Sequence, residues 1–155
     1  GAGDNDGGVS QRVLGTLLTW MSERKAPVFI VATANQIHQL PPELIRKGRF
    51  DGMFFVDLPA TEVRSEIFRI HLERRDLDPL QLDLPGLARA AEGFTGAEIE
   101  QVVVSALYAA QARQQPVDQA LLLHELQATA PLSVVMAEEV AALRAWADGR
   151  AVPAD

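Results

Sequence analysis

The chain has 155 residues, of which 48% are hydrophobic and 23% are charged, the balance of a globular domain. The absence of cysteine excludes a disulfide scaffold, a thiolate zinc site and a cysteine nucleophile. Residues 1–59 carry equal numbers of acidic and basic side chains, so the whole formal net charge of −7 falls on residues 60–155. This acidic half argues against nucleic acid as a partner, because phosphate binding needs a basic stripe. The longest apolar run is too short to cross a bilayer, so we expect a cytoplasmic protein with no membrane partner.

Residues 1–59 predict a mixture of helix and strand. The first eight residues are polar and glycine-rich and indicate a loop, and leucine spacing predicts an amphipathic helix over 9–23. The run from Val28 to Ala34 is apolar at nearly every position, which predicts a strand covered on both faces, as in a parallel sheet. A short helix over 43–47 then follows two prolines, and a second strand is expected over 53–58.

Residues 60–155 predict helices alone. We expect helices over 62–74, from Asp83 to a stop at Gly93, from the Thr95–Glu98 capping box onward, over 118–128 and over 138–147, with a tail at 152–154. In the helix that starts at the capping box, the spacing directs five side chains inward: Ile99, Val102, Val103, Ala106 and Leu107. The fold class is therefore α/β followed by an all-helical part. Two strands cannot form an independent two-sided parallel sheet, so we expect them to belong to a larger one.

Asn35 is the first candidate site residue, because it directly follows a predicted buried strand. Ligands of open α/β sheets bind beyond the carboxyl ends of the strands, where an amide can orient a water molecule or hold a phosphate oxygen. The alternative is an Asx turn that closes the strand.

The basic turn with Arg46 and Arg49 is the second candidate. The planar guanidinium suits phosphate oxygens, and Gly48 between the two arginines lets both side chains project together. Such arginines stabilise the transition state of phosphoryl transfer, often from a neighbouring molecule. The alternative is a solvated turn that pairs with Asp51.

His71 is the third candidate, and the Gly96–Ala97 pair is the fourth. His71 lies one helical turn after Ile67, and its alternative is a half-buried structural histidine. Gly96 and Ala97 open a helix, where free amides favour an anion or the edge of a base, and the alternative is a plain cap. The remaining histidines lie far from carboxylates at ligand spacing, so no metal site is expected.

Five motifs in order make a resemblance to a known family: VFIVATAN, LPPELIRKGRFD, MFFVDLP, EIFRIH and GFTGAEIEQVV. Over residues 9–113 the chain resembles the C-terminal half of an AAA+ ATPase module, in the AAA branch with its second region of homology. The resemblance implies the C-terminal part of a P-loop parallel-sheet subdomain over 1–59 and a helical lid subdomain with a C-terminal extension over 60–155.

The resemblance also implies roles for the candidate residues. Asn35 matches sensor 1, which orients the attacking water, and Arg46 matches the arginine finger that acts on ATP in the neighbouring subunit, with Arg49 as the second arginine. In the lid, Ile67 and His71 match residues that flank the adenine, and Gly96–Ala97 match the start of the helix that packs on the nucleotide. Ala97 stands where other AAA+ clades carry a sensor-2 arginine.

A second resemblance extends to the C-terminus. The stretch PLSVVMAEEVAALRAWADGRAVPA is similar to uncharacterised AAA proteins of cyanobacteria and algal plastids, which implies the plastid stroma if the gene is plastid-encoded. The chain has neither a GxxxxGK[ST] phosphate loop nor an Asp-Glu strand for magnesium. In the family these motifs lie upstream, so we expect a C-terminal piece of a longer ATPase. The longer protein would bind MgATP, whereas this chain alone is expected to bind it weakly and to be inactive.

The function that these resemblances imply is ATP-driven remodelling of a macromolecular partner, such as a protein, by a ring of identical subunits, expected to be a hexamer. The alternative is a non-catalytic acidic helical module for interaction or assembly. The two predicted strands leave apolar edges open, so we expect strand-mediated oligomers or a rearranged first part.

Overall fold

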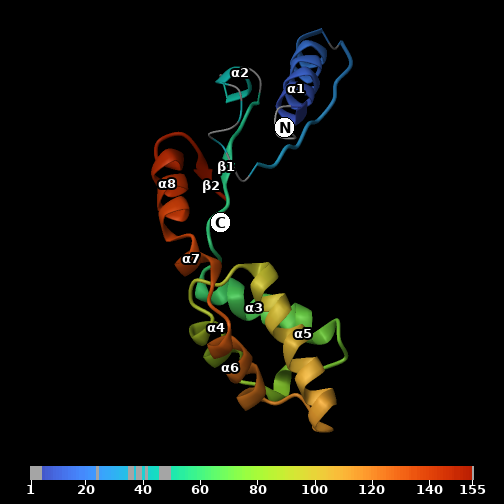
Figure 1. Ribbon diagram of the computed structural model, residues 1–155, viewed down its shortest axis with the longest axis vertical. Coiled ribbons are helices and arrows are strands. Elements are labelled where there is room, and N and C mark those ends of the chain that lie inside the picture. Colours follow the sequence, from blue (N-terminus) through green and yellow to red (C-terminus); the bar gives the residue numbers. More distant parts are fainter. Residues whose placement is uncertain are drawn as a thin grey trace. The chain divides into compact units, whose positions relative to one another are not determined.

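The computed structural model describes residues 5–23, 25–34, 37, 40, 42–45 and 50–154. The chain divides into two compact units between Met53 and Phe54, and each is described by itself (Figure 1). The first unit contains helices α1 (Asn5–Glu23) and α2 (Pro42–Ile45). The first helix begins four residues before the predicted one, within the stretch expected to be a loop.

The strand expected over 28–34 does not form, which corrects the prediction. Residues 27–34 have no regular secondary structure, and the side chains of Phe29 and Val31 are 92% and 77% exposed. A parallel strand exists only when a neighbouring strand accepts and donates its hydrogen bonds. The single ladder among the described residues is formed elsewhere in the chain, so this apolar segment has no sheet to enter.

The second unit contains the expected helices, with small differences at their ends. These are α3 (Thr61–Glu73), the 3₁₀ turn η2 (Pro79–Gln81), α4 (Leu84–Ala90), α5 (Gly96–Arg113), α6 (Gln119–Ala128), α7 (Leu132–Val135) and α8 (Ala137–Ala147). Only η2 and α7 were not predicted. The fold class is thus confirmed as the C-terminal part of an α/β subdomain followed by a helical lid.

The predicted caps fix where these helices begin. Asp83 accepts a hydrogen bond from the Gly86 amide at 2.9 Å, and Asp118 accepts one from the Leu121 amide at 2.8 Å. Each carboxylate thereby satisfies an amide that has no partner within its own helix. Gly93, which follows α4, has a φ of 81°, and a Cβ there would lie 2.4 Å from Ser133 Oγ, so the position requires glycine.

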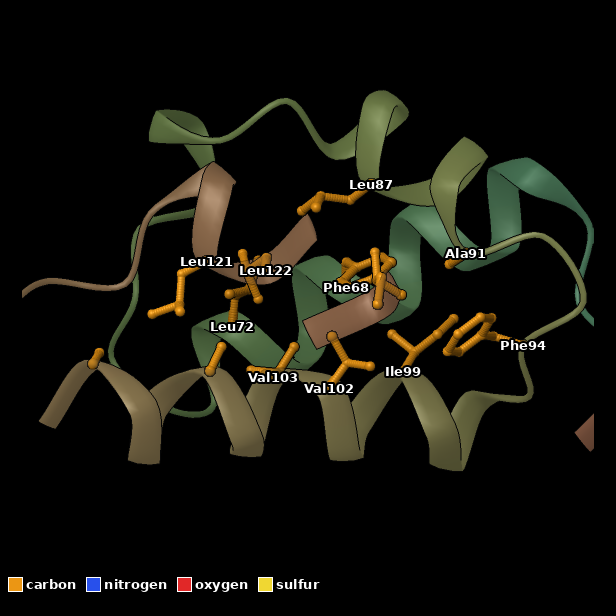
Figure 2. Close-up of a cluster of buried hydrophobic side chains, with 13 residues drawn as sticks. Phe68, Leu72, Leu87, Ala91, Phe94, Ile99, Val102, Val103, Leu121 and Leu122 are labelled. Atoms are coloured by element: carbon orange, nitrogen blue, oxygen red, sulfur yellow. The ribbon is translucent and has the colours of Figure 1, made fainter. Parts of the chain in front are cut away.

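The core of the lid lies between α3, α4, α5 and α6 (Figure 2). Phe68 and Leu72 of α3 are fully buried and face α5. Four of the five side chains predicted to point inward from α5 are buried, and Leu107 is half-buried. The remaining core residues come from the α4 region, the end of α5 and α6: Leu87, Ala91, Phe94, Ala110, Leu121, Leu122 and Leu126.

Arg64 is a buried charged residue of the lid, at 7% exposure. Its Nε donates to the Ala88 carbonyl oxygen at 2.8 Å, its Nη1 to the Pro59 carbonyl oxygen at 2.7 Å and its Nη2 to Thr61 Oγ1 at 3.1 Å. The guanidinium therefore ties the start of α3 to α4 and to the segment that leads into the lid.

Strand β1 (Phe54–Phe55) lies within the predicted second strand, but its partner was not predicted. It pairs in parallel with β2 (Val152–Pro153), with Phe54 opposite Val152 and Phe55 opposite Pro153. The expectation of a tail at 152–154 is therefore wrong. A strand of two residues is too short to show an alternating hydrophobic pattern in the sequence. Only its pairing with the distant strand β1 shows that this segment is extended.

Among the described residues, no helix taken singly has the length and apolar character needed to cross a membrane. The bent pair made by Gln119–Val135 and Ala137–Ala147 meets that test on length and composition only.

Candidate nucleotide-binding site

Three of the predicted site residues lie outside the described residues: Asn35, Arg46 and Arg49. Their assignments as sensor 1 and as the arginine pair therefore stay predictions. The other four lie in the second unit: Ile67 and His71, which resemble adenine-flanking positions, are on α3, and Gly96 and Ala97, which resemble the start of the helix that packs on the nucleotide, begin α5.

The structure brings Ile67 of α3 against the first residue of α5. A Cβ added to Gly96 would lie 3.6 Å from Ile67 Cδ1, which is ordinary van der Waals contact. Ile67 packs on the lid core, and the next residue of α5, Ala97, is exposed. The residues that begin α5 beside Ile67 are thus small, which leaves room for the face of a flat, weakly polar ring.

His71 lies one turn further along α3, and its side chain is 12% exposed. Its Nδ1 is 3.4 Å from Glu100 Oε1, and the same carboxylate oxygen accepts a hydrogen bond from Arg75 Nη2 at 2.8 Å. The hydrogen bond from Arg75 lowers the pKa of Glu100. The histidine is thus fixed between α3 and α5, as a structural residue would be.

The capping box of α5 is present as predicted. Glu98 Oε2 accepts hydrogen bonds from the Thr95 amide and from Thr95 Oγ1, both at 2.8 Å, and the Glu98 amide donates to Thr95 Oγ1 at 3.3 Å. The other carboxylate oxygen accepts from the Leu132 amide at 2.7 Å, so one glutamate joins the start of α5 to α7. Burial alone would raise the pKa of Glu98, but these hydrogen bonds outweigh it and lower the pKa from its ordinary 4.5.

Glu98→Ala is expected to destabilise the lid by about 2 kcal/mol at pH 7, because three donors lose a charged acceptor. A lowered pKa in the folded state means that the contribution of Glu98 is fully present above its ordinary pKa. It is lost as the pH falls through the folded-state pKa. Urea unfolding monitored by circular dichroism between pH 3 and pH 7 checks this.

The matched control for this prediction is Glu92→Ala, at an exposed glutamate just before the same cap. Its expected effect stays within about 0.5 kcal/mol at every pH. A difference between wild type and Glu98→Ala that persisted unchanged at pH 3 would contradict the role of the carboxylate.

Sequence reasoning missed Arg75 and Glu100, which hold His71. Arg75 lies in the turn after α3 and Glu100 lies in α5, and neither forms a local motif, so no signal in the sequence connects them. Among the described residues, no cluster of histidines and carboxylates could hold a metal ion.

Comparison with known proteins agrees with the motif order. Residues 1–58 match the ATPase family associated with various cellular activities (AAA), and residues 81–120 match the AAA+ lid domain. No solved structure matches significantly.

Curated relatives match nearly all of the chain. The chain is similar to the uncharacterized AAA domain-containing protein ycf46 of Pyropia yezoensis, at 44% identity over 94% of this chain and 30% of the relative. The same protein of Gracilaria tenuistipitata var. liui is 42% identical over 92% of this chain and 29% of its own length. The proteasome-activating nucleotidase of Sulfurisphaera tokodaii is 45% identical over 54% of this chain and 21% of its own length. The chain thus spans about 30% of the length of the curated relatives that match it throughout. It belongs to the AAA+ ATPases and carries the C-terminal portion of their module, including the helical lid.

Proposed function

We propose that the protein containing this chain is an ATPase that couples ATP binding and hydrolysis to the remodelling of a macromolecular partner. In this proposal residues 1–59 complete the α/β nucleotide-binding subdomain, and residues 60–155 form the lid with a C-terminal extension. Membership of the AAA+ family supports ATP as the bound nucleotide, and the relatives named above support the assignment over nearly the whole chain.

The position of Ile67 beside Gly96 is the observation that carries the proposal. Ile67 is expected to flank the adenine, and Gly96 is expected to start the helix that packs on the nucleotide. A Cβ added to Gly96 would lie 3.6 Å from Ile67 Cδ1, and His71 is one turn further along α3. An apolar side chain beside a glycine fits a purine ring, because the ring is flat and the glycine leaves room at its edge. These residues, with Ala97, would hold the base.

In this proposal the catalytic roles belong to three polar residues within residues 1–59. The Asn35 amide would orient the attacking water. The Arg46 guanidinium, with Arg49 beside it, would stabilise the negative charge that develops at the terminal phosphate bound by the adjacent subunit. The magnesium ion and the phosphates would be held by residues that this chain does not include.

Because the proposed arginine finger would act between subunits, the active form of the protein would be a ring of identical subunits, for which we propose a hexamer. A protein is the favoured partner, since one relative carries the name proteasome-activating nucleotidase and the acidic lid disfavours nucleic acid. We propose the cytoplasm as the location, or the plastid stroma if the gene is plastid-encoded.

His71→Ala in the intact protein tests the adenine site. The KM for ATP is expected to rise about 10-fold, with kcat changed much less, because the lost contact binds the base equally in the ground and transition states. Steady-state ATPase assays and fluorescent-nucleotide titration measure both quantities.

Glu100→Gln is the matched control, because it removes the charge that holds His71 and Arg75 without removing the ring. It is expected to leave the KM within about twofold of wild type, since a neutral amide still accepts a hydrogen bond. If both variants raise KM equally, His71 is a structural residue only. If the intact protein neither binds nor hydrolyses ATP, the proposed function fails and the acidic interaction module takes its place.

A further inference from the structure

The lid is attached to the two-stranded sheet at both of its ends. Strand β1 leads into α3 through a short connection, and the chain returns after α8 to form β2 beside β1 (Figure 1). Besides the strand ladder, the Ala154 amide donates to the Phe55 carbonyl oxygen at 3.0 Å. The first attachment is covalent, whereas the second consists of a few non-covalent contacts.

An ion pair strengthens the second attachment. Arg144, in the last turn of α8, donates from Nε to Asp57 Oδ1 and Oδ2 at 3.0 Å and 2.9 Å, and its Nη2 lies 2.8 Å from Oδ1. Asp57 follows β1 and also accepts from the Leu58 amide at 2.7 Å. Burial alone would raise the pKa of Asp57, but these partners lower it, so the carboxylate is charged at neutral pH.

The turn between α8 and β2 directs the chain back toward β1. Gly149 has a φ of 68°, a conformation that favours glycine, and the Ala151 amide donates to the Ala147 carbonyl oxygen at 2.9 Å. Arg150 lies over the Trp146 ring, 5.9 Å from its centroid, and donates to the Trp146 carbonyl oxygen at 2.9 Å. The return of the chain is therefore encoded locally.

Pro153 makes β2 the last strand of its sheet. In a parallel ladder the backbone groups of successive residues point to opposite edges, and the Ala154 amide points at β1. The nitrogen of Pro153 therefore faces the outer edge, where proline has no hydrogen to donate. Another strand cannot pair normally there, so any further strand of the sheet joins at the other edge of β1.

We propose that residues 137–154 form a strap, a detachable second tether that holds the C-terminal end of the lid on the edge of the sheet. A body held by one linker can pivot in every direction, whereas a body held at two points can only rotate about the line through them. Closing the strap thus limits the lid to one hinge motion. For its consequence in nucleotide release, this inference rests on the proposed function.

The contacts are weak enough for the strap to open. The ladder has two residue pairs, Phe54 and Val152 are 68% and 59% exposed, and the ion-paired side chains of Asp57 and Arg144 are 35% and 50% exposed. Salt screens exposed ion pairs, so the population of the open strap should rise with ionic strength.

Amide hydrogen exchange of the intact protein, measured on the peptide that contains Ala154, tests the strap. In wild type this amide is expected to exchange about 10-fold more slowly than in an unstructured chain. Arg144→Ala should remove that protection, and the exchanged pair Asp57→Arg with Arg144→Asp should restore it. Arg113→Ala, at an exposed arginine outside the strap, is the control and should change nothing.

Val152→Pro tests the consequence for the nucleotide, because it removes the backbone donor that faces β1. Release of fluorescent ADP from the intact protein is expected to change by about 10-fold relative to wild type, with the protection of Ala154 lost. If the Ala154 amide of the wild-type protein exchanged as fast as in an unstructured chain, the strap would be refuted, whether or not the protein hydrolyses ATP. Protection of Ala154 in a protein that binds no nucleotide would uphold the strap and refute the proposed function. Lost protection with unchanged ADP release would overturn the hinge role.

Discussion

Replacement of Arg46 by alanine in the intact protein is expected to lower kcat for ATP hydrolysis by about 10³- to 10⁵-fold and to leave the Kd for ATP unchanged. The guanidinium would act on the nucleotide of the adjacent subunit, where negative charge grows only in the transition state. Its loss therefore raises the barrier without weakening ground-state binding. Single-turnover ATPase assays and nucleotide titration separate the two quantities.

Lys47→Ala is the matched control for Arg46, because it removes one positive charge from the same turn. A compact ammonium cannot make the bidentate contact of a guanidinium, so its removal is expected to change kcat by about twofold at most. A loss of ATP affinity alone in Arg46→Ala would contradict the action between subunits. Equal losses of kcat in both variants would reduce the role of Arg46 to general positive charge.

Phe68→Ala is expected to destabilise the lid by about 3–5 kcal/mol. The side chain is fully buried between α3, α4 and α5, and its removal leaves a cavity that the rigid helices fill only in part (Figure 2). The free energy of unfolding of natural domains is roughly 5–15 kcal/mol, so this substitution removes a large share of it. Because the chain has two compact units, hydrogen exchange of the buried part of α5 is the suitable measurement: it reports opening of the lid itself.

Leu80→Ala is the control for Phe68, because Leu80 is 93% exposed in η2. Its expected effect is within about 0.5 kcal/mol. If Phe68→Ala left the exchange of α5 unchanged, the hydrophobic cluster would not be what holds the lid together.

The sequence predicts the lid well because its signals are local. The caps at Asp83, Thr95 and Asp118 depend on residues within one helical turn, and the burial of Ile99 and Val102 follows from helical spacing. Each of these features is complete within a short window of the chain, so pattern and structure agree.

The strands could not be predicted in the same way. A strand is defined by its partner, and the partner of β1 follows the whole lid in the chain. The apolar run over 28–34 has the composition of a buried strand, yet composition does not supply the neighbours that a parallel strand needs. Likewise, no spacing rule connects Glu100 with Arg75, although together they fix His71.

The buried arginine at the entrance of the lid has a consequence for how this part of the fold responds to pH and salt. Arg64 donates to two carbonyl oxygens and a hydroxyl, which are neutral acceptors that do not titrate in the physiological range. Neutral acceptors also leave mobile ions little charge to screen. The start of the lid should therefore keep its geometry over a broad range of pH and ionic strength. The response to salt is expected instead at the strap.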